Sequence, residues 1–164
     1  MRPAVGLRAA PAGAGVPPTV EELLDELGGS TVLRQAGHDR PRCRGVAVLL
    51  HGNEPSSIPA LHHWLRWGAV RGVDAVYFVG AVAAARFPPG FAPRMWPGAR
   101  DLNRCFRPPW EGAEGAVAGE ALQLLRQAGC EAIVDLHNNT CQNPAYGVGS
   151  VAGAAELNLA ALFA

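Results

Sequence analysis

The sequence has no lysine and no excess of charge of either sign. Its fourteen basic residues are all arginine and are balanced by fourteen acidic residues, so the formal net charge is zero. Proteins that bind nucleic acid or an anionic membrane through charge usually carry a basic patch or a marked positive charge. We therefore expect neither nucleic acid nor a membrane as a partner.

Long apolar runs and closely spaced cysteine pairs are also absent. No stretch reaches the roughly 18 apolar residues of a transmembrane helix, and proline and glycine interrupt the N-terminal MRPAVGLRAAPAGAGVPP, unlike a signal peptide. The four cysteines (Cys43, Cys105, Cys130 and Cys141) show no Cys-X-X-Cys spacing. We expect free thiols and a cytoplasmic protein.

The length and composition are those of one folded domain. The chain has 164 residues, of which 49% are hydrophobic and 17% are charged, which is enough for a single core. Residues 1–18 are rich in proline, glycine and alanine, and we expect them to form a flexible N-terminus. Residues 19–164 are then the folded domain.

Apolar strand patterns alternate with helical patterns along residues 19–164. Strands are expected at 45–50, 73–82 and 131–136, with a weaker one at 146–151, and helices at 19–27, 59–72, 112–129 and from 154 onward. Residues 84–111 contain six prolines and are expected to be irregular. This alternation predicts an α/β fold, with helices flanking a mostly parallel or mixed sheet.

Two of the predicted strands lead directly into a histidine. His51 follows 45–50 and His137 follows 131–136, while Glu54 lies three residues after His51 in a turn containing glycine and asparagine. Ligands in such folds bind at the carboxyl ends of the strands, and a His, Glu, His set is a known ligand combination for catalytic zinc. Taken alone, a strand-end histidine is more often structural, and we assign His62 and His63 no metal role.

Three stretches carry a family resemblance. LLHGNEPSS, RDLNRCF and VDLHNNT resemble successive motifs of the succinylglutamate desuccinylase/aspartoacylase family, relatives of the zinc carboxypeptidases, across roughly residues 45–150. The resemblance implies a three-layer, carboxypeptidase-like sandwich holding one zinc ion per chain. It also implies zinc ligation by His51, Glu54 and His137.

The resemblance assigns further roles around this metal. Asn103 and Arg104 are similar to the pair that grips a substrate carboxylate, and arginine suits that role because its planar fork binds a carboxylate through two parallel hydrogen bonds. An arginine that polarises the scissile carbonyl corresponds to Arg94 or Arg100, of which we favour Arg94. Asp135 is similar to an aspartate that orients a zinc-bound histidine, and it shares a strand face with His137.

The implied activity is zinc-dependent hydrolysis of an N-acyl amino acid, in which a metal-activated water cleaves the amide bond. The substrate is a small molecule, and self-association into a homo-oligomer stays open.

The chain departs from the family in its catalytic glutamate, which in the family lies on a later strand than this chain reaches. None of Glu111, Glu114, Glu120, Glu131 and Glu156 matches that position. We therefore expect an N-terminal portion of a larger enzyme or a product truncated at the C-terminus. Alternatives are a zinc-binding module or pseudoenzyme without a base, a zinc carboxypeptidase, and an α/β-hydrolase. The last lacks a G-x-S-x-G elbow, because Ser150 stands in GVGSVAG.

Overall fold

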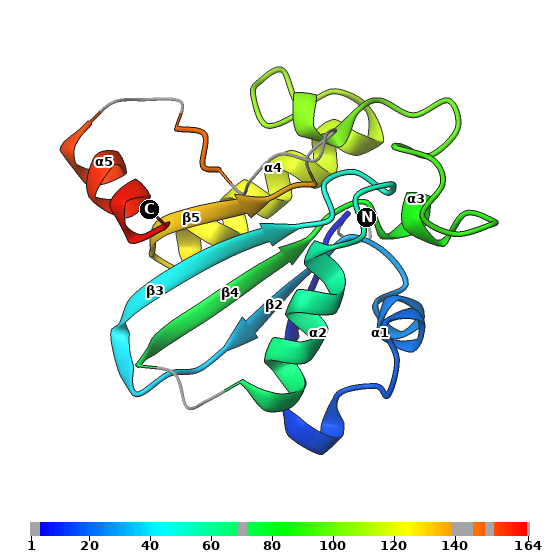
Figure 1. Ribbon diagram of the computed structural model, residues 1–164. Helices are drawn as coiled ribbons and strands as arrows, with labels where there is room; N and C mark the ends of the chain where they lie inside the picture. The colour runs from blue at the N-terminus through cyan, green and yellow to red at the C-terminus, as the bar shows by residue number, and fades with distance from the viewer. Residues whose placement is uncertain (1–3, 69–71, 139–145, 150–152, 164) are drawn as a thin grey trace.

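The computed structural model describes residues 4–68, 72–138, 146–149 and 153–163. Within these residues a mixed sheet has the strand order β1-β2-β4-β3-β5 (Figure 1). The strands are β1 (Gly6–Ala9), β2 (Thr31–Gln35), β3 (Asp39–Val48), β4 (Val73–Val79) and β5 (Cys130–Leu136). The α-helices are α1 (Val20–Leu27), α2 (Ser57–Trp67), α3 (Val82–Arg86), α4 (Gly112–Gln127) and α5 (Ala154–Ala160). Short 3-10 turns are η1 (Gly13–Gly15), η2 (Leu102–Arg104) and η3 (Ala161–Phe163).

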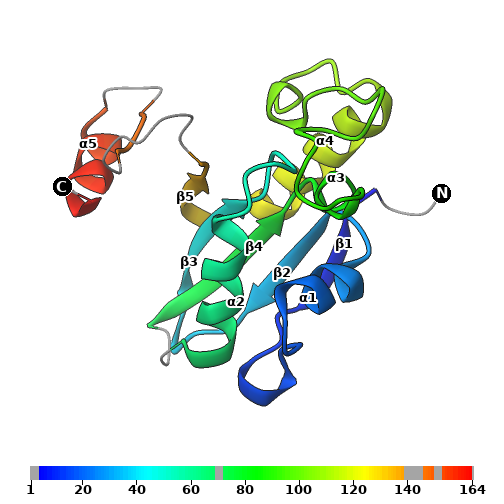
Figure 2. The same cartoon turned by 45° about the vertical axis from the view of Figure 1, so that its right-hand side comes forward.

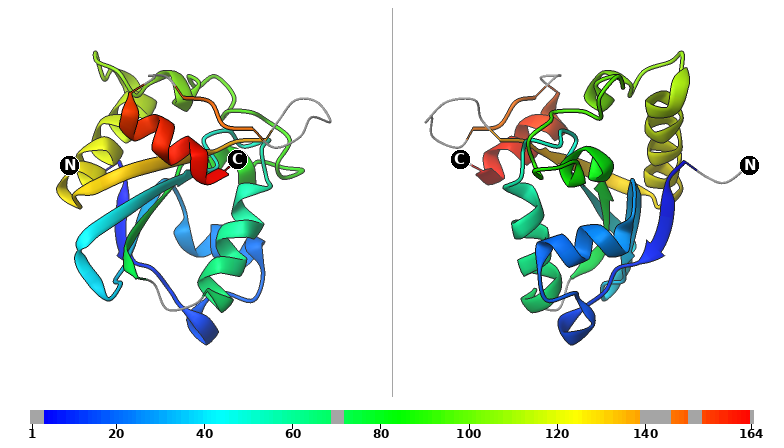
Figure 3. Two further views of the ribbon diagram at one scale, coloured as in Figure 1. Left: turned by 60° about the vertical axis from the view of Figure 1, so that its left-hand side comes forward. Right: turned by 90° about the vertical axis from the view of Figure 1, so that its right-hand side faces the viewer.

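Helices lie on both faces of the sheet. Helices α1 and α2 cover one face and α4 covers the other, as the edge-on view shows (Figure 3). Two buried clusters match these two interfaces: one contains Leu24 of α1 and Leu61 of α2, and the other contains Phe78 of β4 and Ala118 of α4. The predicted α/β sandwich with helices on both sides of a mixed sheet is confirmed.

The order and direction of the strands bring the segments that follow β3 and β5 to the same end of the sheet. Strand β3 is the neighbour of both β4 and β5 and runs parallel to each, while β2 runs antiparallel to β4. In these pairings Val48 lies opposite Val79 on one side and Leu136 on the other. The carboxyl ends of β3 and β5 therefore meet, which places the residues that follow them close together.

Helix α1 begins as its sequence predicts. Thr19 accepts a hydrogen bond from the backbone N–H of Glu22, and the Glu22 side chain accepts one from the N–H of Thr19, which together form a capping box. Gly28 ends the helix in the left-handed region with φ 69°.

The N-terminal region differs from the expectation of a flexible tail. Residues 6–9 form β1, which pairs in parallel with β2, and Val5 and Val16 are buried. Strand β2 itself was not expected. The expected strand at 146–151 is not formed at residues 146–149, and its last two residues lie outside the described ranges.

Strand β5 was expected to be buried, and it is instead an edge strand of the described sheet. Its Ile133 and Leu136 are 45% and 36% exposed, and no residue of the following α5 is buried. Figure 2 shows α5 lying to one side of the sheet, beyond β5. A cavity of about 540 Å³ lies on the α2 face of the sheet and reaches from Val73 and Arg44 to Leu136. No helix among the described residues is long and apolar enough to cross a membrane.

Candidate metal centre

The turn after β3 is shaped by backbone contacts in the core. Leu49, directly after the strand, has a φ of 55°, in the left-handed region that side chains rarely adopt. Its N–H donates to the Ser57 hydroxyl over 3.1 Å and its carbonyl accepts from the N–H of Ala81 over 2.6 Å. These contacts fix the backbone where the chain leaves β3, just before His51 and Glu54.

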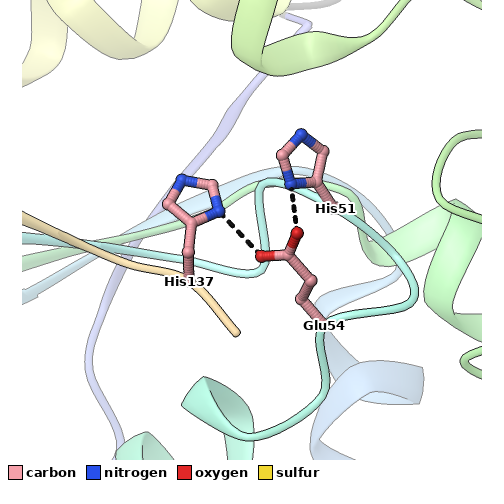
Figure 4. A group of neighbouring side chains, drawn as sticks. All are labelled: His51, Glu54 and His137. Atoms are coloured by element: carbon pink, nitrogen blue, oxygen red, sulfur yellow. Dashed lines mark hydrogen bonds and ion pairs between the residues drawn. The ribbon is translucent and has the colours of Figure 1, made fainter. Parts of the chain in front are cut away.

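His51, Glu54 and His137 form a connected group (Figure 4). The Nδ1 atom of His51 lies 2.8 Å from Glu54 Oε1, and the Nδ1 atom of His137 lies 2.7 Å from Glu54 Oε2. One ligand atom of each residue lies within 4.8 Å of the others. His51 is buried, Glu54 is largely buried and His137 is exposed, so one side of the group is open to solvent.

A second carboxylate holds the far nitrogen of each imidazole. His51 Nε2 lies 3.0 Å from Asp101 Oδ1, and His137 Nε2 lies 2.7 Å from Asp135 Oδ2. Zinc-binding histidines characteristically direct one nitrogen at the metal and donate the other N–H to a carboxylate. Both imidazoles therefore have the surroundings that suit a metal at Nδ1.

Arg94 lies directly against this group. Its Nε donates to Asp101 over 3.2 Å and its Nη1 donates to Glu54 over 3.3 Å, while Nη2 lies 2.7 Å from His51 Nε2. A guanidinium can only donate, so the last contact uses the Nε2 lone pair of His51, whereas the contact with Asp101 requires Nε2–H. The two contacts belong to different tautomers, and a metal at Nδ1 selects the one that donates to Asp101.

Gly52 brings the Arg94 segment to the site. Its N–H donates to the Arg94 carbonyl over 2.8 Å. A Cβ at this position would lie 2.6 Å from the Pro93 carbonyl oxygen and 2.7 Å from Ala84 Cβ. Glycine is thus needed here for close backbone approach.

The remaining predicted residues lie on or near η2. The backbone N–H of Asn103 donates to Asp101 over 2.9 Å, and its Nδ2 lies 3.5 Å from His137 Nε2. Arg104 is exposed, and although its backbone N–H donates to the Asp101 carbonyl over 2.9 Å, its guanidinium makes no hydrogen bond or ion pair with another described residue. Arg100, the other candidate for the carbonyl-polarising arginine, donates to the carbonyl of Glu111 and does not contact the His–Glu–His group among the described residues.

The charges of the group shift the pKa values of its members in opposite directions. Burial alone would raise the pKa of Glu54, but hydrogen bonds from His137 and the N–H of Asn138, with the charges of both histidines, hold it below its usual value. Burial alone would lower the pKa of His137, yet its hydrogen bonds and charge interactions with Glu54 and Asp135 raise it.

The two supporting aspartates differ from each other. Burial would raise the pKa of Asp101, but the charge of His51 and hydrogen bonds from Asn103, His51 and Arg94 lower it. For Asp135, burial outweighs the opposing influence of His137, and its pKa is raised. The surroundings of Asp101 thus favour its ionised form, whereas those of Asp135 favour its protonated form.

The pattern of donors and the fold can be compared with known proteins. The family model described as the succinylglutamate desuccinylase/aspartoacylase catalytic domain matches residues 48–160. The chain belongs to this family. No curated protein and no solved structure matches it. The resemblance seen in the three sequence motifs is thereby confirmed, and the family is zinc carboxypeptidase-like.

The donor set fits the metal that the family uses. Two imidazole nitrogens and a carboxylate converge, each imidazole is held from behind by a carboxylate, and one side is open, as in catalytic zinc sites. The group could therefore hold zinc.

Asp101 is the residue that the sequence analysis missed. It contacts both His51 and Arg94, yet the sequence alone suggested roles in the RDLNRCF stretch only for Arg100, Asn103 and Arg104. Its place inside that stretch was the available clue. His62, in contrast, makes no hydrogen bond with the described His–Glu–His group. Its Nε2–H donates to the Pro17 carbonyl over 2.7 Å, in line with the structural role expected for it.

Proposed function

We propose that the protein is a zinc-dependent hydrolase that cleaves the amide bond of an N-acyl amino acid. The observation that supports this most directly is the convergence of His51, Glu54 and His137 within 4.8 Å in a chain of a deacylase family. When bound, zinc supplies a Lewis acid that polarises a carbonyl and activates water for attack near neutral pH. The acyl group and the amino acid are left unassigned.

In this proposal the chain's own residues hold the ion and orient the substrate. His51, Glu54 and His137 are the ligands, and Asp101 and Asp135 fix the orientation of the two imidazoles through their far nitrogens. One zinc ion is bound per chain.

Arg94 is the proposed catalytic arginine. Its guanidinium lies at the metal centre, 39% exposed, so it can direct N–H donors toward the oxygen on which negative charge develops. Arg100 is less well placed, because its side chain donates to the Glu111 carbonyl and does not contact the His–Glu–His group within the described part of the chain.

Asn103 and Arg104 are proposed to bind the substrate carboxylate. Arg104 is exposed and unpaired within the described part of the chain, so its guanidinium is available for a bidentate contact. Asn103 precedes Arg104 in the chain and its Nδ2 lies 3.5 Å from His137 Nε2, which would place a carboxylate bound by this pair near the metal centre.

A second candidate function is zinc binding without hydrolysis. Among the described residues, the carboxylates that bond the two histidines are Glu54, Asp101 and Asp135, and each is already engaged with an imidazole. None of the other glutamates considered above contacts this group: Glu120, for example, accepts from the N–H of Val5, and Glu131 pairs with Arg44. Beyond these three, no described carboxylate contacts the His–Glu–His group, so none is placed there to act as general base.

The test measures metal content and turnover on the same preparations. Protein purified without chelator should contain about one zinc per chain, which His51→Ala and His137→Ala should lose. His63→Ala is the matched control, because this exposed histidine of α2 stacks on Trp67 and should leave zinc content unchanged. Equal zinc in the parent and both ligand variants would exclude the metal site. Zinc with no turnover of N-acetyl-aspartate or N-succinyl-glutamate would favour the second candidate.

The free cysteines and the exposed apolar residues of β5 bear on compartment and assembly. Cys43, Cys105 and Cys130 are free thiols, which suits a cytoplasmic protein. The exposed Ile133 and Leu136 on an edge strand suit self-association into a homo-oligomer. Sedimentation velocity over a range of concentrations tests the latter, and a monomer throughout would exclude it.

A further inference from the structure

Two cysteines face each other at the end of the sheet opposite the metal centre. Cys43 of β3 and Cys130, the first residue of β5, are directly paired in the parallel register of these strands. Their Sγ atoms lie 3.5 Å apart. Cys43 is 2% exposed and Cys130 is partly exposed, so a small reagent reaches the pair from the β5 side.

The backbone geometry suits a covalent bond between these sulfurs. Neighbouring strands lie about 4.7–4.9 Å apart, within the Cα separation of roughly 4.4–6.8 Å that disulfides span. The sulfurs, now 3.5 Å apart, would have to approach to a bond of about 2.05 Å, and rotation of the two side chains can bring them together. The register irregularity between Cys43 and Arg44 gives the backbone additional freedom to adjust.

Cys105 is a buried cysteine that, unlike Cys43 and Cys130, does not face another described cysteine. It is also 2% exposed, but its Sγ donates to the carbonyl of Asp101 over 3.3 Å. No other described cysteine is paired with it. Paired sulfurs on adjacent strands are thus specific to Cys43 and Cys130 within the described part of the chain.

We propose that Cys43 and Cys130 form a reversible disulfide that fastens the start of edge strand β5 to β3. The oxidant is a small-molecule disulfide of the glutathione type. A thiolate of the pair attacks it, forms a mixed disulfide and releases one small thiol; the second cysteine then displaces the other small thiol. Two protein thiols become one disulfide, the reagent is reduced to two thiols, and the two protons end on those thiols.

The environment of Cys130 disfavours its thiolate form. Burial, together with the hydrogen bond and the electrostatic interaction with Cys43, raises the pKa of Cys130 to about 12. Because the thiolate is the attacking species, Cys130 itself is a weak nucleophile toward the disulfide reagent at neutral pH.

The bond would act on the strand that presents His137. In the described structure β5 pairs with β3 alone, and Cys130 and His137 stand at its opposite ends. The bond would close a loop between residues 87 positions apart, which strongly restricts the unfolded chain. We expect oxidation to raise the Tm by about 10 °C.

The test uses the full chain carrying Cys141→Ser, incubated with excess oxidised glutathione at pH 8.5. Expected results are a mass loss of two hydrogens, a linked peptide containing Cys43 and Cys130 in a non-reducing digest, and a Tm increase that dithiothreitol reverses. Cys130→Ser should show none of these, and Cys105→Ser should show all of them. The comparison with and without dithiothreitol needs no further variant, so a poorly folding Cys130→Ser would not affect the result.

Three outcomes would overturn the proposal. They are an unchanged mass after prolonged oxidation, a linked peptide that contains Cys105, and a Tm that does not change although the Cys43–Cys130 peptide is found.

Discussion

Replacing Asp101 with asparagine tests how far the metal centre depends on a residue that touches no substrate. The carboxylate accepts from His51 over 3.0 Å, from the N–H of Asn103 over 2.9 Å and from Arg94 over 3.2 Å. A hydrogen bond to a charged group contributes about 1.5–3 kcal/mol, against about 1 kcal/mol between neutral groups. Asp101→Asn keeps a neutral acceptor for His51, so the loss at that bond is about 1–2 kcal/mol.

This loss corresponds to a zinc Kd that is roughly tenfold higher, at the low end of the roughly 10–100-fold typical for such supporting residues. The measurement is a competition titration against a chromophoric zinc chelator at fixed pH and salt. Asp25→Asn is the control, because Asp25 is an exposed residue of α1 that forms an ion pair with Arg86 outside the metal centre. Thermal unfolding of the metal-free variants verifies that each is folded. An unchanged zinc Kd in folded Asp101→Asn would show that His51 needs no carboxylate behind it.

Four further predictions concern the substrate, the pH dependence and the fold. Arg104→Lys should raise KM strongly and leave zinc content unchanged, since a point charge cannot replace a bidentate fork; Arg100→Lys is the control, and a wild-type kcat/KM in Arg104→Lys would make this residue structural. Because the pKa of His137 in the metal-free protein is raised above 6.5, zinc must displace a proton below that pKa, so the zinc Kd should rise about tenfold per pH unit as the pH falls through it; a Kd independent of pH there would exclude His137 as a ligand. The same raised pKa stabilises the metal-free fold fully at low pH and less as the pH rises through it, which pH-dependent unfolding can check. Thr19→Ala should lower the free energy of unfolding by about 1 kcal/mol in chemical denaturation, whereas Thr19→Ser retains the capping hydroxyl and should cost little; equal losses would show that the cap is unimportant.

The parts of the fold that could be predicted are those that depend on residues close together in the sequence. Apolar runs at 45–50 and 131–136 identify strands, and the histidines that follow them meet because parallel neighbours end at one edge. Strand β2 could not be found this way: it is five residues long, ends in Arg34 and Gln35, and is held by pairing with β4 some forty residues later. Such non-local pairing leaves little trace in a five-residue window.

The role of Asp101 was hidden for a similar reason. It meets His51 because an irregular, proline-rich segment returns to the strand ends and passes close to Gly52. No periodicity describes that path. The edge position of β5 could not be predicted either, because an apolar run such as residues 131–136 predicts a strand without indicating whether one or two strands flank it.

The unusual backbone of Leu49 affects how the site meets its ion. A non-glycine residue at φ 55° costs about 1–3 kcal/mol, and it is held by a side chain that is 1% exposed and by hydrogen bonds to Ser57 and Ala81. The fold therefore sets the turn carrying His51 and Glu54 before any metal arrives. The conformational entropy of His51 and Glu54 is already lost when the chain folds, so little entropy loss is left to oppose the binding of a metal ion. The site is pre-organised, and loosening the core beneath Leu49 would weaken metal affinity without altering a single ligand.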